Sequence, residues 1–476
     1  MLKDHTDAGR QSSAPANDHR SAPRPRCVAV VGGGVSGLIA AAELQRAGHE
    51  ITVFEAGSYP GGHTNTITVE TPAGDRNIDT GFIVLNDRNY PNFEQILAEL
   101  GVATQETNMS FGVSDGHGDF EWAARGARGI FARPRHAVDP RFIRMLADLV
   151  RFNRQARSLL NANGSGPSLR RFLADGNYSE YFIERLLVPQ AAAVWSADPE
   201  QMWSFPASFL SAFFHNHGVL QLIGRPRWRS IPGGSRTYVE ALTAPFAERI
   251  RLHAAVREVE RADDGVWVST EAERERFDEV VIAAHSDQAL AMLSEPTSAE
   301  REVLGAIDYQ PNQAVLHTDT SLMPRRRSAW ASWNYHLDDS SEAAGRSTVT
   351  YDMNRLQRLD DETRYLVTLN RSEAIDPAKI IRVIDYEHPV FTNEGMRAQA
   401  RWSEISGVDR IHYAGAYWRW GFHEDGVWSG LRVSEMLGGR GPGLNGKVKI
   451  AVDASPAERS GVATSASAPL AGRASA

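Results

Sequence analysis

Three glycines in a fixed spacing are the residues of this chain that most clearly point to chemistry. Gly32, Gly34 and Gly37 form a Gly-x-Gly-x-x-Gly turn between an apolar segment, 27–31, and a helical pattern, 35–48. In such a turn the first glycine permits the tight bend and the second lets the backbone approach a pyrophosphate. The third glycine lets the helix pack closely on the strand.

An acid completes the pattern. Residues 51–54 predict a second strand, which carries Glu55 to the same edge of the sheet, where a carboxylate can bind a ribose hydroxyl pair. The free N–H groups of Val35 and Ser36, at the start of the helix, favour phosphate. The sequence therefore predicts a dinucleotide site. The alternative is an ordinary glycine turn in a doubly wound domain.

A second chemical cluster lies near the end of the chain. His423, Glu424 and Asp425 stand together between two glycines, and a histidine beside two carboxylates can tune pKa values or move a proton. The structural alternative is a helix start, with Asp425 as the cap, Glu424 complementing the dipole and His423 at the surface. His317, at the end of a predicted strand, is a further polar candidate or simply a strand-end histidine.

Other candidates carry weaker signals. The spacing of His215 and His217 could suit a metal, but no acid cluster adjoins them, so we predict no metal site. Four tryptophans could wall an apolar tunnel or belong to the core: Trp330, Trp333, Trp418 and Trp420. A basic, aromatic patch could meet phosphate, a lipid headgroup or solvent: Arg225, Arg227, Trp228 and Arg229.

Composition narrows the class of protein. The chain has 476 residues, 42% of them hydrophobic, and a net charge of −8, which argues against a nucleic-acid surface. The single cysteine, Cys27, fits a reducing compartment, and no apolar run is long enough to span a bilayer. The N-terminal segment has no apolar stretch typical of a secretory signal. We therefore expect a cytoplasmic protein, with peripheral contact at the inner membrane face left open.

The order of the patterns predicts an α/β fold in which a discontinuous Rossmann-like domain is interrupted twice by an α+β substrate or cap domain. Residues 138–224 are mainly helical in pattern, and a final helix is expected from about Gly426 to Leu437. The expected division is 26–100, 225–300 and 400–440 for the nucleotide domain, 101–224 and 301–399 for the cap domain, and disordered ends at 1–25 and 441–476.

These motifs resemble those of the flavin-containing amine oxidase and phytoene desaturase superfamily. The resemblance is carried by VVGGGVSGL at 30–38, the turn at 60–63, residues 79–82 and GFHEDG at 421–426. A closer resemblance is to stand-alone bacterial FAD proteins and to the N-terminal oxidase-like domain of plant cyclopropane fatty acid synthases. Residues 86–92, 216–217, 221–228, 316–319, 322–324 and 329–334 carry that second resemblance.

The resemblance implies FAD, with its pyrophosphate on the Gly32–Gly37 turn and its adenosine ribose on Glu55. It also implies cofactor contacts from Ala56, Gly61, Gly62, His63, Thr64, Val256, Gly415, Gly426 and Val427. The sequence departs from the superfamily at one point, since Ala416 follows Gly415 where an aspartate is usual. This departure implies one fewer charged contact to FAD.

The expected activity is an FAD-dependent oxidation of an apolar substrate, a fatty acyl chain or phospholipid, by hydride transfer to flavin N5. His423, Glu424 and His317 are the catalytic candidates. Two alternatives stay open: an amine oxidase, and a non-catalytic FAD-binding partner of a lipid-modifying methyltransferase. The expected partners are a small-molecule or lipid substrate and that methyltransferase, with no nucleic acid.

Overall fold

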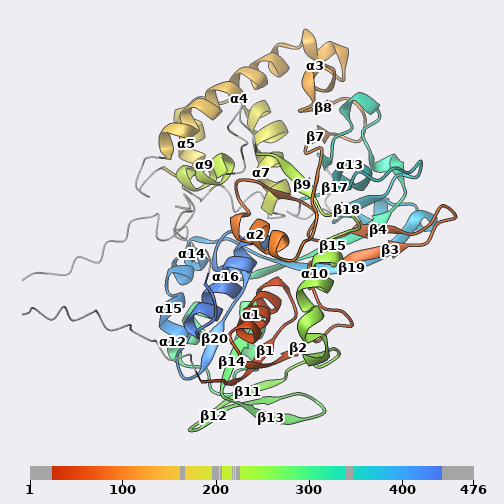
Figure 1. Cartoon of the computed structure of the whole chain (residues 1–476). Coiled ribbons are helices and arrows are strands. Elements are labelled where there is room, and N and C mark those ends of the chain that lie inside the picture. Colours follow the sequence, from red (N-terminus) through yellow and green to blue (C-terminus); the bar gives the residue numbers. More distant parts are fainter. Residues whose placement is uncertain are drawn as a thin grey trace, which may run out of the picture.

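The computed structural model describes residues 24–160, 167–195, 203, 206–216, 218, 220, 226–337 and 347–441. The ends that the sequence predicts to be disordered lie almost entirely outside the described residues, as do His217 and Arg225. Figure 1 shows two bodies stacked on one another, with β1 and α1 in the lower one and α3 and α4 at the far end of the upper one.

A parallel sheet of five strands forms the centre of the lower body, in the order β10-β2-β1-β14-β20. Its strands are β1 (Cys27–Val31), β2 (Glu50–Phe54), β10 (Ile250–Arg251), β14 (Glu279–Ile282) and β20 (Ile411–Tyr413). Because β1 is apolar and almost wholly buried, it occupies the middle of the sheet. These strands come from three distant stretches of sequence, and the predicted Rossmann-like architecture is confirmed.

A three-stranded antiparallel sheet lies against the parallel one and shares its core. Its strands are β11 (Glu258–Ala262), β12 (Gly265–Ser269) and β13 (Arg274–Phe277). Phe277 packs edge-on against Phe54 of β2, with ring centroids 5.8 Å apart. The helices of this body are α1 (Val35–Arg46), α2 (Pro91–Glu99), α10 (Arg236–Thr243), α11 (Ser286–Met292), α12 (Ser298–Leu304), α14 (Asn393–Ala400), α15 (Trp402–Ile405) and α16 (His423–Met436).

Helices α1 and α16 pack in unusually close contact, since α16 presents glycines to α1. A Cβ atom on Gly430 would lie 2.4 Å from the carbonyl oxygen of Ser36, and one on Gly426 would lie 2.6 Å from the Val35 side chain. The prediction that this last helix begins near Gly426 is wrong, because the helix begins at His423. His423, Glu424 and Asp425 therefore form its first turn rather than a loop before it.

The upper body is built on a seven-stranded mixed sheet in the order β19-β15-β18-β17-β16-β7-β8. Its strands are β7 (Phe111–Ser114), β8 (Glu121–Ala123), β15 (Tyr309–His317), β16 (Trp333–His336), β17 (Val349–Asp352), β18 (Leu366–Leu369) and β19 (Ile380–Pro389). Strand β19 was not predicted, although its β-branched and aromatic run is typical of a strand. It pairs with β15 along its whole length.

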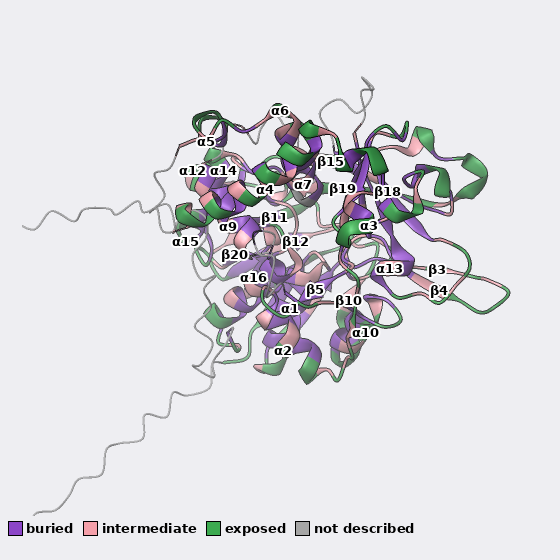
Figure 2. Cartoon of the chain, turned by 90° about the horizontal axis from the view of Figure 1, so that it is seen from above, coloured by how far each residue is buried: buried purple, intermediate pink, exposed green. Residues whose placement is uncertain are grey.

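Helices cover this sheet and bring their own aromatic core. They are α3 (Gly126–Ile130), α4 (Pro140–Leu159), α5 (Leu169–Asp175), α6 (Glu180–Phe182), α7 (Val188–Trp195), α9 (Ala207–Asn216) and α13 (Met353–Leu356). Phe142, Phe152 and Phe213 are fully or almost fully buried in this second core. Figure 2 shows buried residues filling the interior and exposed ones on the outer faces of the helices.

Short strands link the two bodies. They are β3 (Thr66–Val69) paired with β4 (Arg76–Asp79), and β5 (Leu85–Asn86) and β6 (Gln105–Glu106) on either side of β9 (Trp228–Ser230). At this junction buried Asp79 accepts hydrogen bonds from Thr66, Ser235 and Gln357. Among the described residues, no helix is long and apolar enough to cross a membrane.

Candidate active site

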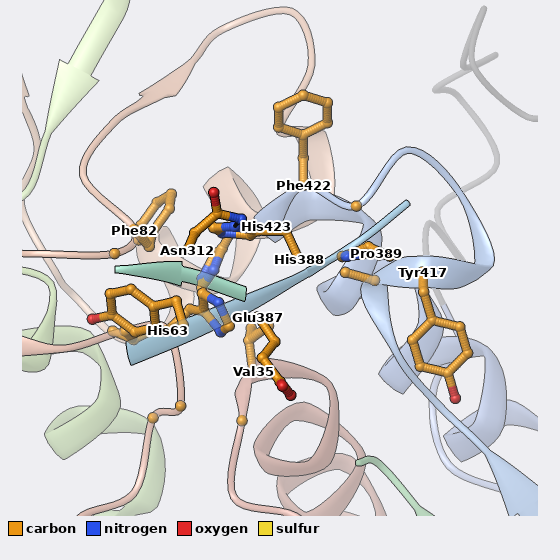
Figure 3. Close-up of a pocket in the computed structure, with 18 of the residues that line it drawn as sticks. Val35, His63, Phe82, Asn312, Glu387, His388, Pro389, Tyr417, Phe422 and His423 are labelled. Carbon is orange, nitrogen blue, oxygen red and sulfur yellow. Dashed lines mark hydrogen bonds between the residues drawn. The ribbon is translucent and has the colours of Figure 1, made fainter. Parts of the chain in front are cut away.

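A large cavity lies between the parallel sheet and the seven-stranded sheet, with a volume of about 1710 Å³. One side is walled by the turn between β1 and α1, the end of β2 and the turn at 61–64. The other side is walled by parts of β15, β16, β17 and β19. Figure 3 shows Val35 at the start of α1 on one side of it, with Asn312 and His388 on the neighbouring strands β15 and β19.

The glycine turn takes the conformation that its spacing predicts. Gly32 has a φ of +107°, which favours glycine, and a Cβ on Gly37 would lie 2.0 Å from the carbonyl oxygen of Gly32. Apart from its own chain neighbours, a Cβ on Gly34 would meet no atom of the described residues within 4 Å, and Gly34 lines the cavity. The turn is therefore closely packed at Gly37 and open to the cavity at Gly34, so a phosphate group could approach its backbone N–H groups.

Glu55 holds this turn from the side. One of its carboxylate oxygens accepts a hydrogen bond from Gly33 N at 2.7 Å, and the other accepts one from Gly57 N at 2.6 Å. Gly33, Glu55 and Ala56 all line the cavity. The carboxylate thus fixes two loops while remaining at the cavity wall.

The second glycine turn joins the first. Gly61 N donates to the carbonyl oxygen of Gly33 at 2.7 Å, so the two turns share one wall. Gly62, His63 and Thr64 follow along the cavity, and the Thr64 hydroxyl is hydrogen-bonded to the Tyr238 hydroxyl at 2.8 Å.

Distant segments complete the wall. Val256 and Gly415 line the cavity, as the resemblance implies, together with Ala416 and Tyr417. Tyr417 is buried beside Trp418, with ring centroids 4.9 Å apart.

His423 lies at the wall but is enclosed by rings. It stacks on Phe82 with centroids 3.8 Å apart and meets Phe93 edge-on at 4.7 Å. Its Nε2 is hydrogen-bonded to the Tyr238 hydroxyl at 2.9 Å. Burial lowers the pKa of His423 to about 3, so the ring is neutral at physiological pH. It is not the surface residue of the structural alternative, and its ring contacts position it firmly.

Comparison with known proteins identifies the architecture. The family model described as flavin containing amine oxidoreductase matches residues 35–437. The chain belongs to this family.

AofH of Mycobacterium tuberculosis, whose name describes a flavin-containing monoamine oxidase, is 27% identical over 288 residues, 56% of this chain and 59% of that protein. The chain therefore spans about three fifths of the length of such curated relatives. Among solved structures, a cyclohexylamine oxidase from Brevibacterium oxydans has a TM-score of 0.62 at 15% identity, covering 87% of this chain and 99% of that one. A fatty acid isomerase from P. acnes that produces CLA has a TM-score of 0.62 at 16% identity, covering 86% and 97%.

FAD is thus the cofactor that membership of this family implies, and the cavity fits it. The open space in front of Gly34, the N–H groups at the start of α1 and the carboxylate of Glu55 form one continuous wall. The nucleotide end of FAD would lie there. The residues that would hold the rest of FAD are Gly61, Gly62, His63, Thr64, Val256 and Gly415.

Two of the implied contacts do not reach the cavity. Gly426 and Val427 lie behind its wall, where Gly426 contacts Val35 and Val427 is fully buried in the core. Their positions fit the packing of α16 on α1 better than direct contact with the cofactor.

The proposal of Glu424 as a catalytic residue is wrong in this geometry. Its carboxylate accepts hydrogen bonds from the backbone of Asn92 and Phe93 and from the Asn92 amide, at 2.6–3.1 Å. It therefore caps the N-terminus of α2 from a neighbouring helix. Burial raises the pKa of Glu424 to about 8. Asp425 caps its own helix, accepting from Phe422 N at 2.9 Å.

His317 is also wrongly placed as a catalytic candidate. It is fully buried, and its ring contacts the Thr368 hydroxyl at 2.8 Å and accepts from Asp319 N at 3.0 Å. The Thr368 hydroxyl is hydrogen-bonded to the Thr350 hydroxyl, which is in turn hydrogen-bonded to His336 Nε2, each at 2.8 Å. This row of hydrogen bonds crosses four strands of the sheet, so His317 has a structural role.

Sequence reasoning missed His388 and Asn312, which meet across β19 and β15. Asn312 Nδ2 lies 2.9 Å from His388 Nδ1, while Asn312 Oδ1 accepts from Asn370 at 2.7 Å. That second bond fixes the amide orientation, so Asn312 donates to Nδ1 and the proton of His388 is on Nε2. The signal that could have found His388 is the unrecognised strand β19.

His63 faces this pair. Its ring stacks on Tyr386 with centroids 4.6 Å apart and lies 5.3 Å from that of His388. His63 Nε2 is buried, and no described residue is its hydrogen-bond partner. Burial lowers the pKa of His63 to about 3 and that of His388 to about 4, so both rings are neutral.

The cavity wall also contains many apolar side chains, beside polar ones such as Thr107, Ser110 and Gln313. The apolar ones include Met109, Phe111, Trp333, Tyr351, Leu369, Ile384, Phe391, Trp420 and Phe422. Two of the four candidate tryptophans thus line the cavity. Trp418 is buried in the core, and Trp330 donates to the carbonyl oxygen of Pro324 at 2.6 Å.

The described residues of the basic, aromatic patch do not all lie at the cavity. Arg227 and Trp228 line the cavity, and Arg227 also pairs with Asp87 at 3.3 Å. Arg229 pairs instead with Glu94 at 3.6 Å.

Proposed function

We propose that this chain is an FAD-dependent oxidoreductase that oxidises a fatty acyl or phospholipid chain. FAD, when bound, supplies the hydride acceptor at N5. The observation that carries the proposal is the apolar part of the cavity wall. It includes Phe111, Trp333 and Tyr351 on the seven-stranded sheet. Such a wall suits a long hydrocarbon chain, because it offers area and few polar partners.

Polar groups at the cavity wall support an oxidation. Removing a hydride from one carbon of a chain and a proton from a neighbouring carbon requires a proton acceptor. His63 Nε2 lies at the cavity wall without a hydrogen-bond partner among the described residues, so its position fits a proton acceptor. Burial lowers the pKa of His63 to about 3, so it would act as a weak base that holds the proton only transiently. His388 is held with its own proton on Nε2 by Asn312, so it can donate a hydrogen bond to the substrate.

An amine oxidase is the second candidate. The stacked rings of His63 and Tyr386 form an aromatic surface against which an amine could lie. AofH and the cyclohexylamine oxidase bear names that describe this chemistry. A third candidate, an FAD-binding partner of a lipid-modifying methyltransferase without activity of its own, depends on Ala416 in place of the usual acid. We propose a cytoplasmic location for each.

Anaerobic reduction of the bound flavin separates these candidates. The purified yellow protein is mixed without oxygen with phospholipids bearing unsaturated acyl chains, with the corresponding free fatty acids, or with primary and cyclic amines. Bleaching by a lipid substrate supports the first proposal. Bleaching by amines alone contradicts it in favour of the second. No bleaching by any of them, with an intact flavin spectrum, favours the third.

A further inference from the structure

The first observation is a concentration of positive charge on one outer part of an acidic protein. Residues 125–160 contain nine arginines, no lysine and two aspartates, a formal charge of +7 in a chain whose net charge is −8. They form α3, α4 and the connection between them. Figure 1 shows these elements together at the end of the upper body farthest from β11–β13. The charge is therefore gathered at one end of the molecule.

Apolar side chains are exposed on the same elements. Val138 is 81% exposed, Val150 60% and Ile143 44%. The inner face of α4 is already occupied, because Phe142, Met145, Phe152 and Ala156 are buried in the core. Thus α4 has an apolar inner face and, in addition, apolar residues on the outside. An ordinary surface helix shows polar residues there.

The helical period places the outer residues in one row. Positions 143, 147, 150 and 154 fall on one face of an α-helix, so Ile143, Ala147 and Val150 lead to Arg154 along α4. Arg144 lies beside this row, and Ile143, Arg144, Val150 and Arg154 are all exposed. Apolar residues flanked by arginines are typical of a helix that lies in a bilayer interface, where arginine heads reach lipid phosphates.

The cavity wall extends to this end of the molecule. Ala124 lines the cavity and directly precedes Arg125, one residue before α3. Arg125 donates to the carbonyl oxygen of Trp330 at 2.8 Å, in the segment that leads to Trp333 of the cavity wall. The basic segment therefore begins next to the cavity wall.

We propose that the outer face of α4, with Val138, docks on the surface of an anionic phospholipid membrane. The opposite charges of arginine and phosphate select this occupant, and Val138, Ile143 and Val150 enter the acyl boundary. Docking would hold the substrate side of the cavity against the bilayer, from which an acyl chain could enter. This last consequence rests on the proposed function, whereas the docking itself does not.

The test measures flotation of the flavin-loaded full chain with vesicles of phosphatidylcholine alone or mixed with phosphatidylglycerol. The wild type should float with the mixed vesicles, less so as salt is raised, and hardly with phosphatidylcholine. Two arginines near an anionic surface contribute a combined factor of about 25 in partitioning, so R144Q/R154Q should bind about 25-fold more weakly. The affinity of I143S/V150S for the mixed vesicles should fall by about 10-fold or more.

Matched controls remove equivalent groups elsewhere. R274Q/R276Q removes two exposed arginines from β13, and L252S/V383S removes two exposed apolar side chains. Both should bind like the wild type. The proposal would be overturned if the controls lost as much vesicle binding as the α4 variants, or if the wild type bound both vesicle types equally. It would also be overturned if the protein bound polyglutamate but neither vesicle, which would favour an acidic protein partner.

Flavin reduction by lipid in detergent micelles keeps the two proposals apart. Vesicle binding that depends on α4, without any reduction, would contradict the proposed function and leave the docking intact. If lipid in micelles reduced the flavin of a protein that binds no vesicle, the docking proposal would be contradicted and the proposed function would stand.

Discussion

Replacement of Glu55 by glutamine should weaken FAD binding sharply. Its carboxylate accepts two short hydrogen bonds, from Gly33 N at 2.7 Å and Gly57 N at 2.6 Å. Glutamine has one side-chain oxygen, so it can keep only one of these and turns an N–H group toward the other. A hydrogen bond to a charged group contributes about 1.5–3 kcal/mol. Loss of one such bond should therefore raise the dissociation constant for FAD by roughly 10- to 150-fold. The affinity falls because FAD must then order a loosened loop.

The assay removes FAD from the protein and titrates it back, following the quenching of flavin fluorescence. Glu50→Gln is the matched control, since it neutralises an exposed acid at the start of the same strand, β2. The control should bind as the wild type does. A dissociation constant for E55Q within about threefold of that of the control would refute the role given to these two hydrogen bonds.

Three further predictions follow from the site. Gly37→Ala should lower both thermal stability and flavin content, because its Cβ would lie 2.0 Å from Gly32 O. Gly34→Ala should instead fold normally and lose only affinity for FAD. Melting curves measured with and without FAD distinguish these two outcomes. Glu424→Gln should destabilise α2 by about 1–3 kcal/mol. Burial raises the pKa of Glu424 from 4.5 to about 8, so the folded state keeps a proton that the unfolded state releases, and stability falls with rising pH across that window. The deficit of E424Q against the wild type should therefore shrink across it, and a deficit that does not change with pH would contradict this assignment. His63→Gln, measured with saturating FAD because His63 lies at the cofactor wall, should slow flavin reduction about 100-fold or more in anaerobic stopped flow. A rate equal to that of the wild type would exclude His63 as the proton acceptor.

Local patterns were sufficient to predict the glycine turn and the strand that carries Glu55, both of which lie at the cavity wall. The turn at Gly32–Gly37 depends on residues adjacent in sequence, and the same holds for the strand that delivers Glu55. Each of these features has a short-range physical cause, such as a positive φ at Gly32 or the N–H groups of a helix start. The family resemblance extended this to the turn at 61–64 and to the wall at Val256 and Gly415.

Roles that depend on distant partners could not be predicted in the same way. Glu424 looks catalytic beside His423, but its partners on α2 are more than 300 positions away in sequence. His317 looks like a free strand end until β18 supplies Thr368. His388 was missed because β19 was not recognised as a strand, although its β-branched and aromatic run is typical of one.

The close packing of α1 on α16 has a consequence for biosynthesis. Helix α1 ends at Arg46, whereas its glycine-faced partner α16 is complete only at residue 436. Strand β20, at the edge of the parallel sheet, is likewise made long after α1. The dinucleotide cradle therefore cannot reach its packed form before α16 has been made, although its own motif is complete by Glu55. Nascent chains stalled before α16 should accordingly retain no flavin, so cofactor capture would follow the synthesis of α16.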